Sequence, residues 1–115
     1  MEQPELVLEV VVDEHHVTVA VAGDIDLLTA EKFRDFACDE IAAHPRPAVI
    51  DMTGVGFVDS SGISALVAIR RQAEALGVSV VVEPSRRVQA ALKLAGLTEI
   101  FHSDDPDDSG TGQPA

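Results

Sequence analysis

Hydrophobic positions along this chain follow two spacings, one typical of strands and the other typical of helices. Short β-branched runs predict strands at residues 6–12, 17–21, 48–52 and 78–82, and residues 99–101 are a candidate for a short fifth strand. Longer segments have apolar residues three or four positions apart. They predict helices at residues 30–43 and 61–76, and a third helix that opens after Pro84-Ser85 and stops at Gly96.

The order of these elements predicts how the sheet is built. A short polar segment, residues 13–16, joins the first two strands and is typical of a hairpin. Two strand–helix–strand crossovers follow, and such crossovers join parallel strands with right-handed connections. We therefore predict an α/β fold with a mixed sheet of four to five strands and helices mainly on one face. The strand at 48–52 is almost continuously apolar, a pattern typical of strands covered on both faces.

Glycine, proline and threonine are expected to mark the ends of these elements. Gly23 is expected to end the second strand, Thr29 to cap the first helix and Pro45 to stop it. Residues 53–58 contain two glycines and are predicted to form a loop before the second helix. Gly77 follows that helix at the position where a left-handed residue is expected.

Length and charge indicate one acidic domain. The chain has 115 residues, enough for one compact domain and too few for two. Its net charge of −12 disfavours binding to nucleic acid or to an anionic membrane surface, because Lys and Arg provide most of the attraction to both. Residues 1–102 are predicted to form the domain. Residues 103–115 contain four Asp and no large apolar residue, so a disordered acidic tail is expected there.

The cysteine content and the apolar runs indicate a cytoplasmic protein. Cys38 is the single cysteine, so an internal disulfide and a thiolate metal cage are excluded and a reducing compartment is expected. No apolar run approaches the roughly 20 residues that cross a bilayer, and the N-terminus lacks the basic start of a signal peptide. His15 and His16 are adjacent in a hairpin turn, so no metal is expected there, and no cofactor is indicated.

The most specific chemistry lies in the sequence Asp59-Ser60-Ser61-Gly62. It places two hydroxyls at a predicted helix start, where backbone N–H groups are unpaired and the helix dipole is positive. A phosphate on Ser60 is favoured at such a position and would add a charge of about −1.5 to −2 at neutral pH. Asp and Ser are also among the best N-cap residues. Simple helix capping therefore explains the same segment, and local chemistry alone favours that interpretation.

Three stretches in register point to a known family. Residues 49–66 closely resemble the signature of STAS domains, specifically that of bacterial anti-sigma factor antagonists. Residues 23–30 are similar to the family's Gly-x-(Leu/Ile)-Asp-x-x-Thr-Ala segment. Residues 82–85, with Val88, Leu92 and residues 96–97, resemble the family's last strand-to-helix passage. The resemblance spans residues 5–102, so it covers the whole predicted domain.

The resemblance implies a STAS fold and a protein that switches partners. Ser60 would be the phosphoacceptor, with Ser61 as a less favoured second acceptor, and the partner-binding residues would be Asp26, Asp59, Ser60, Ser61 and Gly62. The implied partner is an anti-sigma factor that is also a serine kinase of the GHKL type. The unphosphorylated antagonist would bind this kinase and release its sigma factor, and a phosphatase would reset the switch.

Three other interpretations use the same residues. A STAS subunit of a phospholipid-transport ABC system would keep the fold and bind an ATPase constitutively, but the intact Asp-Ser-Ser-Gly segment favours the switch. A response-regulator pocket built from Asp24, Asp26, Asp51 and Asp59 is disfavoured, because the chain opens with a hairpin and no lysine follows the last strands to close such a pocket. An enzyme is disfavoured, because the spacing implies no Cys–His or Ser–His–Asp set and no Gly-rich loop with a Lys for ATP.

Overall fold

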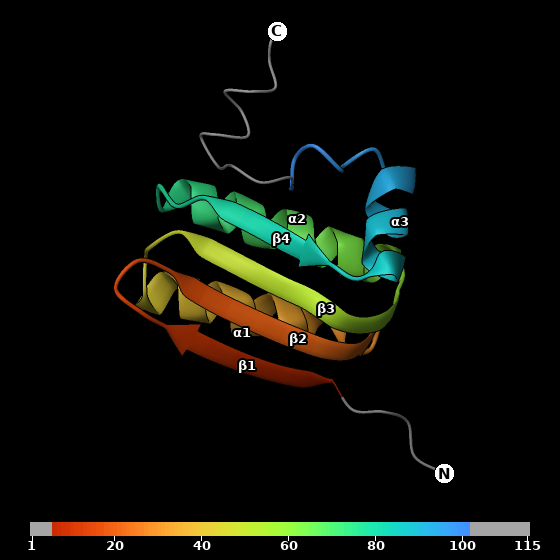
Figure 1. Cartoon of the computed structure of the whole chain (residues 1–115), viewed down its shortest axis with the longest axis horizontal. Helices are drawn as coiled ribbons and strands as arrows, with labels where there is room; N and C mark the ends of the chain where they lie inside the picture. Colours follow the sequence, from red (N-terminus) through yellow and green to blue (C-terminus); the bar gives the residue numbers. More distant parts are fainter. Residues whose placement is uncertain (1–5, 102–115) are drawn as a thin grey trace, which may run out of the picture.

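The structure, a computed structural model, describes residues 6–101 of the chain (Figure 1). In chain order its elements are β1 (Val7–Val12), β2 (Val17–Ile25), α1 (Ala30–Ala43), β3 (Ala48–Val58), α2 (Ser60–Ala75), β4 (Val80–Pro84) and α3 (Arg86–Leu94). The acidic tail predicted at residues 103–115 lies outside the described residues, so it stays a prediction.

The four strands lie side by side in the order β1-β2-β3-β4. β1 and β2 form an antiparallel hairpin, while β2–β3 and β3–β4 are parallel pairs. The predicted α/β fold with its mixed sheet is therefore confirmed. The candidate fifth strand at residues 99–101 forms a turn instead. Phe101 packs into the core, and its carbonyl accepts one hydrogen bond from Val82 N–H at 3.3 Å, which is too little pairing to extend the sheet.

The described helices cover one face of the sheet. Figure 1 shows α1 and α2 together behind the strands, with α3 across the end of β4. Burial in β3 alternates accordingly, with Ile50 and Met52 buried and Val49 half-buried. The expectation of a strand covered on both faces is therefore not met. Val49 lies between Thr18 and Val81 on the open face, where β-branched side chains pack well on a pleated, half-exposed surface.

The two central parallel strands run further than the sequence predicts. β2 continues through Gly23 to Ile25, β3 continues through the predicted loop to Val58, and the two extensions pair with each other. Gly23 has φ 108° and adjoins a register irregularity, so it marks a bulge rather than a strand end. A Cβ on Gly54 would lie 2.8 Å from Ala22 Cβ, so this glycine allows close pairing.

The core is entirely apolar among the described residues. Its largest buried side chains come from the helix-covered face of the sheet, from α1 and α2, and from the final turn: Ile25, Phe33, Ile41, Ile50, Met52, Leu66, Ile69 and Phe101. No polar or charged residue in the described part of the chain is buried. The polar chemistry of residues 6–101 is therefore at the surface, where another molecule can reach it.

The hairpin turn accommodates the two adjacent histidines. The carboxylate of Asp13 accepts hydrogen bonds from the backbone N–H groups of His15 at 2.7 Å and His16 at 2.8 Å. These bonds stabilise the charged form, so the pKa of Asp13 lies below its ordinary value of 3.8. Both histidines are exposed, as a solvated turn predicts.

Candidate functional site

The Asp-Ser-Ser-Gly segment lies at the carboxyl ends of two neighbouring parallel strands. Val58 ends β3 opposite Ile25, which ends β2. α2 begins at Ser60, so the connection from β3 is a single residue, Asp59. Asp59 N–H donates to the carbonyl of Ile25 at 3.2 Å. This bond holds the start of α2 beside the loop that follows β2.

Asp59 caps α2 with its own side chain. Its backbone is extended, with φ −114° and ψ −168°, and its Oδ1 accepts from the N–H of Ser61 at 2.8 Å and of Gly62 at 3.4 Å. A cap of this kind contributes about 1 kcal/mol. The capping interpretation is therefore right for Asp59. The sequence suggests that a phosphate on Ser60 would accept hydrogen bonds from first-turn N–H groups. In the unmodified protein, the N–H groups of Ser61 and Gly62 already donate to Asp59.

The two serines of the segment differ in exposure. Ser60 is the first residue of α2 and is exposed, whereas Ser61 is half-buried and lines a hollow between α1 and α2. A hydroxyl has to protrude to enter another protein's active site, and Ser60 meets this requirement better than Ser61. A phosphate on Ser60 would stand one residue from the Asp59 carboxylate, so two like charges would meet at the helix start.

The loop between β2 and α1 is held by Asp26 and Thr29. Asp26 Oδ1 accepts from the N–H groups of Leu28 at 3.0 Å and Thr29 at 3.2 Å. Thr29 Oγ1 accepts from Asp26 N–H at 3.0 Å and donates to the Asp24 carbonyl at 2.9 Å. Thr29 is the N-cap residue of α1 as predicted, but its hydroxyl closes the loop and does not cap the helix. The half-buried carboxylate of Asp26 shapes this loop through its backbone contacts.

Gly62, in the first turn of α2, is buried. A Cβ on Gly62 would lie 2.5 Å from Val58 Cγ2 and 2.9 Å from Ile25 Cγ2, so a side chain there would have to displace both. Glycine therefore lets the first turn of α2 lie directly against the ends of β2 and β3. The family resemblance implies that Gly62 is one of the partner-binding residues. In the structure it lies below the surface and sets the position of the serines.

Large apolar side chains that the sequence did not single out lie at the same end of the sheet. Leu27 and Leu28, in the loop after β2, are 78% and 85% exposed, and Phe57, near the end of β3, is 44% exposed. Leu27 and Ser61 line the same hollow, with a volume of about 360 Å³. The sequence does contain a sign of this exposed surface. Leu27 and Leu28 are consecutive leucines in a predicted loop, and they lie outside the apolar stripe of the following helix.

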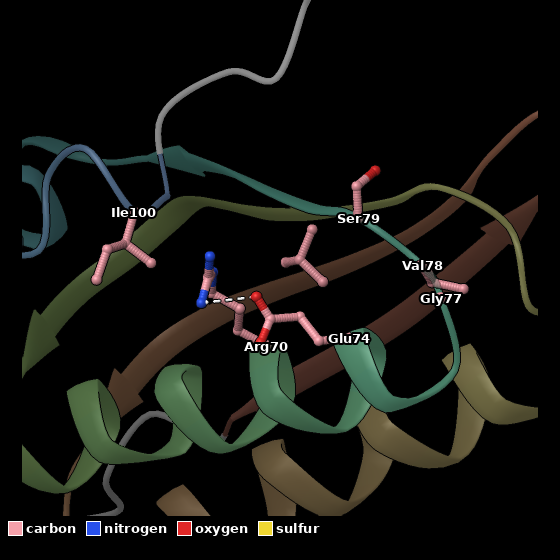
Figure 2. Close-up of a pocket in the computed structure, with 7 residues that line it drawn as sticks. Arg70, Glu74, Gly77, Val78, Ser79 and Ile100 are labelled. Carbon is pink, nitrogen blue, oxygen red and sulfur yellow. Dashed lines mark ion pairs between the residues drawn. The ribbon is translucent and has the colours of Figure 1, made fainter.

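A second hollow, of about 310 Å³, lies near the other end of α2 (Figure 2). Arg70, Glu74 and Ile100 line it, together with residues 77–80. The guanidinium of Arg70 and the carboxylate of Glu74 form an ion pair at 2.9 Å, drawn as a dashed line in Figure 2. Because a helix rises 1.5 Å per residue, this hollow is about 20 Å from Ser60 along α2. None of its lining residues belongs to the predicted site.

Other chemical features of the described residues are sparse. Within residues 6–101, no three His, Cys, Asp or Glu side chains are grouped so that they could hold a metal ion. In the same range, no helix has the length and apolar character required to cross a membrane. Cys38 is buried in α1, and burial raises the pKa of its thiol.

Comparison with known proteins identifies the class that this fold and this helix start define. The family model for the STAS domain matches residues 7–107 of the chain. The chain therefore belongs to the STAS domain family, as the three sequence stretches predict. Its relatives place it more narrowly.

Anti-sigma factor antagonists are among its relatives and structural neighbours. The anti-sigma-F factor antagonist RsfB of Mycobacterium tuberculosis is 31% identical over 105 residues, which are 88% of this chain and 84% of RsfB. The crystal structure of an anti-sigma factor antagonist from Mycobacterium paratuberculosis is 27% identical, with a TM-score of 0.73 over 93% of this chain and 92% of that chain. The Bacillus protein SpoIIAA, in its phosphorylated form, shares the fold, with a TM-score of 0.61, 21% identity and coverage of 93% and 96%. Within the STAS family, the chain belongs to the anti-sigma factor antagonists.

Proposed function

We propose that this protein is a phosphoserine switch: it binds an anti-sigma factor while Ser60 is free and leaves it when Ser60 carries a phosphate. The anti-sigma factor is a GHKL-type serine kinase that supplies the phosphate from ATP, and a phosphatase removes it. The protein acts in the cytoplasm, where it regulates sigma-factor-dependent transcription. It catalyses nothing itself, because its task is to present a hydroxyl to the kinase.

The observation that carries this proposal is the exposed hydroxyl of Ser60 on a fixed helix start. Asp59 caps the helix, Gly62 lets its first turn lie against the strand ends, and Ser60 itself is exposed. A kinase therefore meets an acceptor whose backbone is already ordered, so little conformational entropy is lost on docking. The structure of SpoIIAA in a phosphorylated form supports the view that this fold tolerates a phosphate.

A phosphate on Ser60 would alter recognition more than folding. An unmatched charge at a protein interface costs a few kcal/mol, and each 1.4 kcal/mol changes affinity by about tenfold. The neighbouring Asp59 carboxylate adds like-charge repulsion at the same point. We therefore expect phosphorylation to weaken binding by on the order of a hundredfold and to leave the fold intact.

Phosphate transfer from purified kinases tests this function. The protein is incubated with MgATP and each GHKL-type anti-sigma factor of the same organism, and its intact mass is then measured. The wild type should gain one phosphate, Ser60→Ala none, and Ser61→Ala one. Ser79→Ala is a matched control, because Ser79 is also exposed but lies at the other end of α2.

The outcomes discriminate between the alternatives. Phosphate on Ser60→Ala, together with its loss in Ser61→Ala, would move the acceptor to Ser61. A wild type that gains no phosphate from any of these kinases would contradict the switch. It would favour a STAS module that binds its partner constitutively, such as the subunit of a phospholipid-transport system.

A further inference from the structure

Leu27 and Leu28 form an apolar knob beside the candidate phosphoacceptor. Both are more than three-quarters exposed, although they are adjacent in sequence and precede a helix with a well-buried stripe. The exposure is fixed by the loop, because Asp26 Oδ1 accepts from Leu28 N–H at 3.0 Å and Thr29 Oγ1 closes the turn. Fixed, exposed apolar side chains of this kind are typical of interaction sites.

The knob continues into a hollow between the start of α2 and α1, with both apolar and polar residues in its lining. Leu27 lines this hollow, and three alanines on the facing sides of α1 and α2 line it as well: Ala30, Ala65 and Ala68. Ser61 and Ser64 contribute hydroxyls on the α2 side. The knob, the hollow and Ser60 thus share one end of the sheet, so a single partner face can cover all of them.

The charge around this surface identifies the kind of partner. Four carboxylates belong to this end of the molecule: those of Asp24 near the end of β2, Asp26 in the loop that follows, Asp59 at the cap of α2, and Glu31, which lines the hollow. Arg34, which also lines the hollow, is paired with Glu31 at 3.5 Å and with Asp35 at 2.9 Å. A complementary partner therefore presents an apolar socket bordered by Lys and Arg.

We propose that Leu27 and Leu28 are the apolar anchors with which this protein docks into such a socket on its anti-sigma factor. This inference rests on the proposed function and names the residues that give the interface its affinity. Anchors that fill a pocket at the centre of an interface account for most of its binding energy. Docked leucines also exclude water around Ser60, so a phosphate there would have to lose its hydration on binding. The anchors therefore increase the loss of affinity that phosphorylation of Ser60 causes.

Affinity measurements on the full chain test the anchors. By calorimetric titration, the anti-sigma factor that binds the wild type is measured against Leu27→Ala, Leu28→Ala, the double variant and Leu94→Ala. We expect each single anchor variant to lose about tenfold in affinity and the double variant more. Leu94 is 91% exposed on α3 and serves as the matched control, so its variant should stay within about twofold. Leu28→Met keeps a large apolar side chain, so it should retain most of the affinity that Leu28→Ala loses.

A double-mutant cycle separates the anchors from the switch. Ser60→Glu is measured alone and together with the two leucine substitutions, and its penalty should shrink severalfold once water can reach residue 60. Full affinity of both leucine variants, with Ser60→Glu still weakening binding, would overturn the anchors and leave the proposed function standing. Loss of affinity in the leucine variants, with Ser60→Glu harmless, would support the anchors and contradict the switch. Binding of the wild type to no anti-sigma factor of the organism would overturn both.

Discussion

The two ends of helix α2 both carry a surface hollow of similar size, yet they differ in what surrounds it. At the amino end, a one-residue connection and a side-chain cap present the free hydroxyl of Ser60 beside exposed leucines. At the carboxyl end, Arg70 and Glu74 pair with each other on the α2 side of the hollow (Figure 2). The charged groups of the second end satisfy one another. Arg34 and Glu31 pair in the same way at the first end, but that end also carries Leu27 and Leu28, which are more than three-quarters exposed.

This difference shows that the volume of a hollow is a poor guide to function in a small surface-recognition domain. The hollows measure about 360 Å³ and 310 Å³, so size does not separate them. What separates them is the extent of exposed apolar surface: Leu27 and Leu28 beside the first hollow are 78% and 85% exposed, whereas Ile100 at the second is 39% exposed. Ordered apolar side chains in water forgo burial free energy of about 25 cal/mol per Å², and a protein gains that free energy only when a partner covers them.

The largest expected effect is on anti-sigma factor affinity, when a negative charge is added at one end of α2 or at the other. We expect Ser60→Glu to weaken anti-sigma factor binding by on the order of a hundredfold, because the added carboxylate enters the interface unmatched. Ser79→Glu places the same charge on an exposed position at the other end and should change affinity by less than about twofold. Titration of both variants gives the ratio. Equal losses would mean that overall acidity, rather than position, governs binding.

The next largest effect is the loss of stability when a glycine at either end of α2 is replaced by alanine. Gly62→Ala forces a Cβ to 2.5 Å from Val58 Cγ2 and should cost about 1–3 kcal/mol of unfolding free energy. Gly77→Ala meets no crowding but has to adopt φ +75°, so about 1 kcal/mol is expected. Gly56→Ala is the control, because its nearest neighbour, Asp24 Oδ1, is 3.7 Å away. Urea unfolding measures all three, and a Gly62→Ala variant as stable as Gly56→Ala would contradict the close seating of α2.

The helix cap is expected to contribute somewhat less. Asp59→Ala removes the acceptor of the Ser61 and Gly62 N–H groups and should destabilise the protein by about 1 kcal/mol. Asp59→Asn keeps a side-chain oxygen at the N-cap and should restore most of that stability. Thermal unfolding of both variants is the measurement. An Asp59→Ala protein with wild-type stability would show that the cap contributes nothing measurable.

The smallest effect is a pH dependence at the hairpin turn, at the other end of β2 from the site. The folded-state pKa of Asp13 is lowered by the backbone N–H groups of His15 and His16. Its stabilising contribution is therefore fully present above the ordinary pKa of 3.8 and is lost as pH falls through the lower folded value. Asp13→Asn should show a shallower loss of stability than the wild type between about pH 5 and pH 2. Identical acid unfolding curves would exclude this contribution, and anti-sigma factor affinity should not change.

Most of the fold could be predicted because its periodicities are strong. The β-branched runs and the apolar stripes of α1 and α2 specify a hairpin followed by two crossovers, which only a few sheet topologies satisfy. The strand ends could not be predicted. Gly23 and Gly54 read as breaks in sequence, whereas they permit a bulge and a close approach that depend on the neighbouring strand.

The candidate site could be predicted in part. The residue types of the Asp-Ser-Ser-Gly segment indicate a helix start with a free hydroxyl, and Ser60 is indeed exposed there. Helix capping, which the local chemistry favours, is confirmed for Asp59. The sequence does not show that Gly62 lies below the surface, because that depends on how α2 meets β2 and β3. The exposure of Leu27 and Leu28 likewise depends on the loop that Asp26 and Thr29 close.

Partner binding is proposed to depend on whether one hydroxyl, that of Ser60 at the amino end of α2, carries a phosphate. The most direct measurement compares the anti-sigma factor's affinity for the unmodified protein with its affinity for protein enzymatically phosphorylated on Ser60, with circular dichroism recorded on both forms. We expect the affinity of the phosphorylated form to be lower by on the order of a hundredfold, with an unchanged spectrum. Equal affinities, with phosphate confirmed on Ser60, would contradict it.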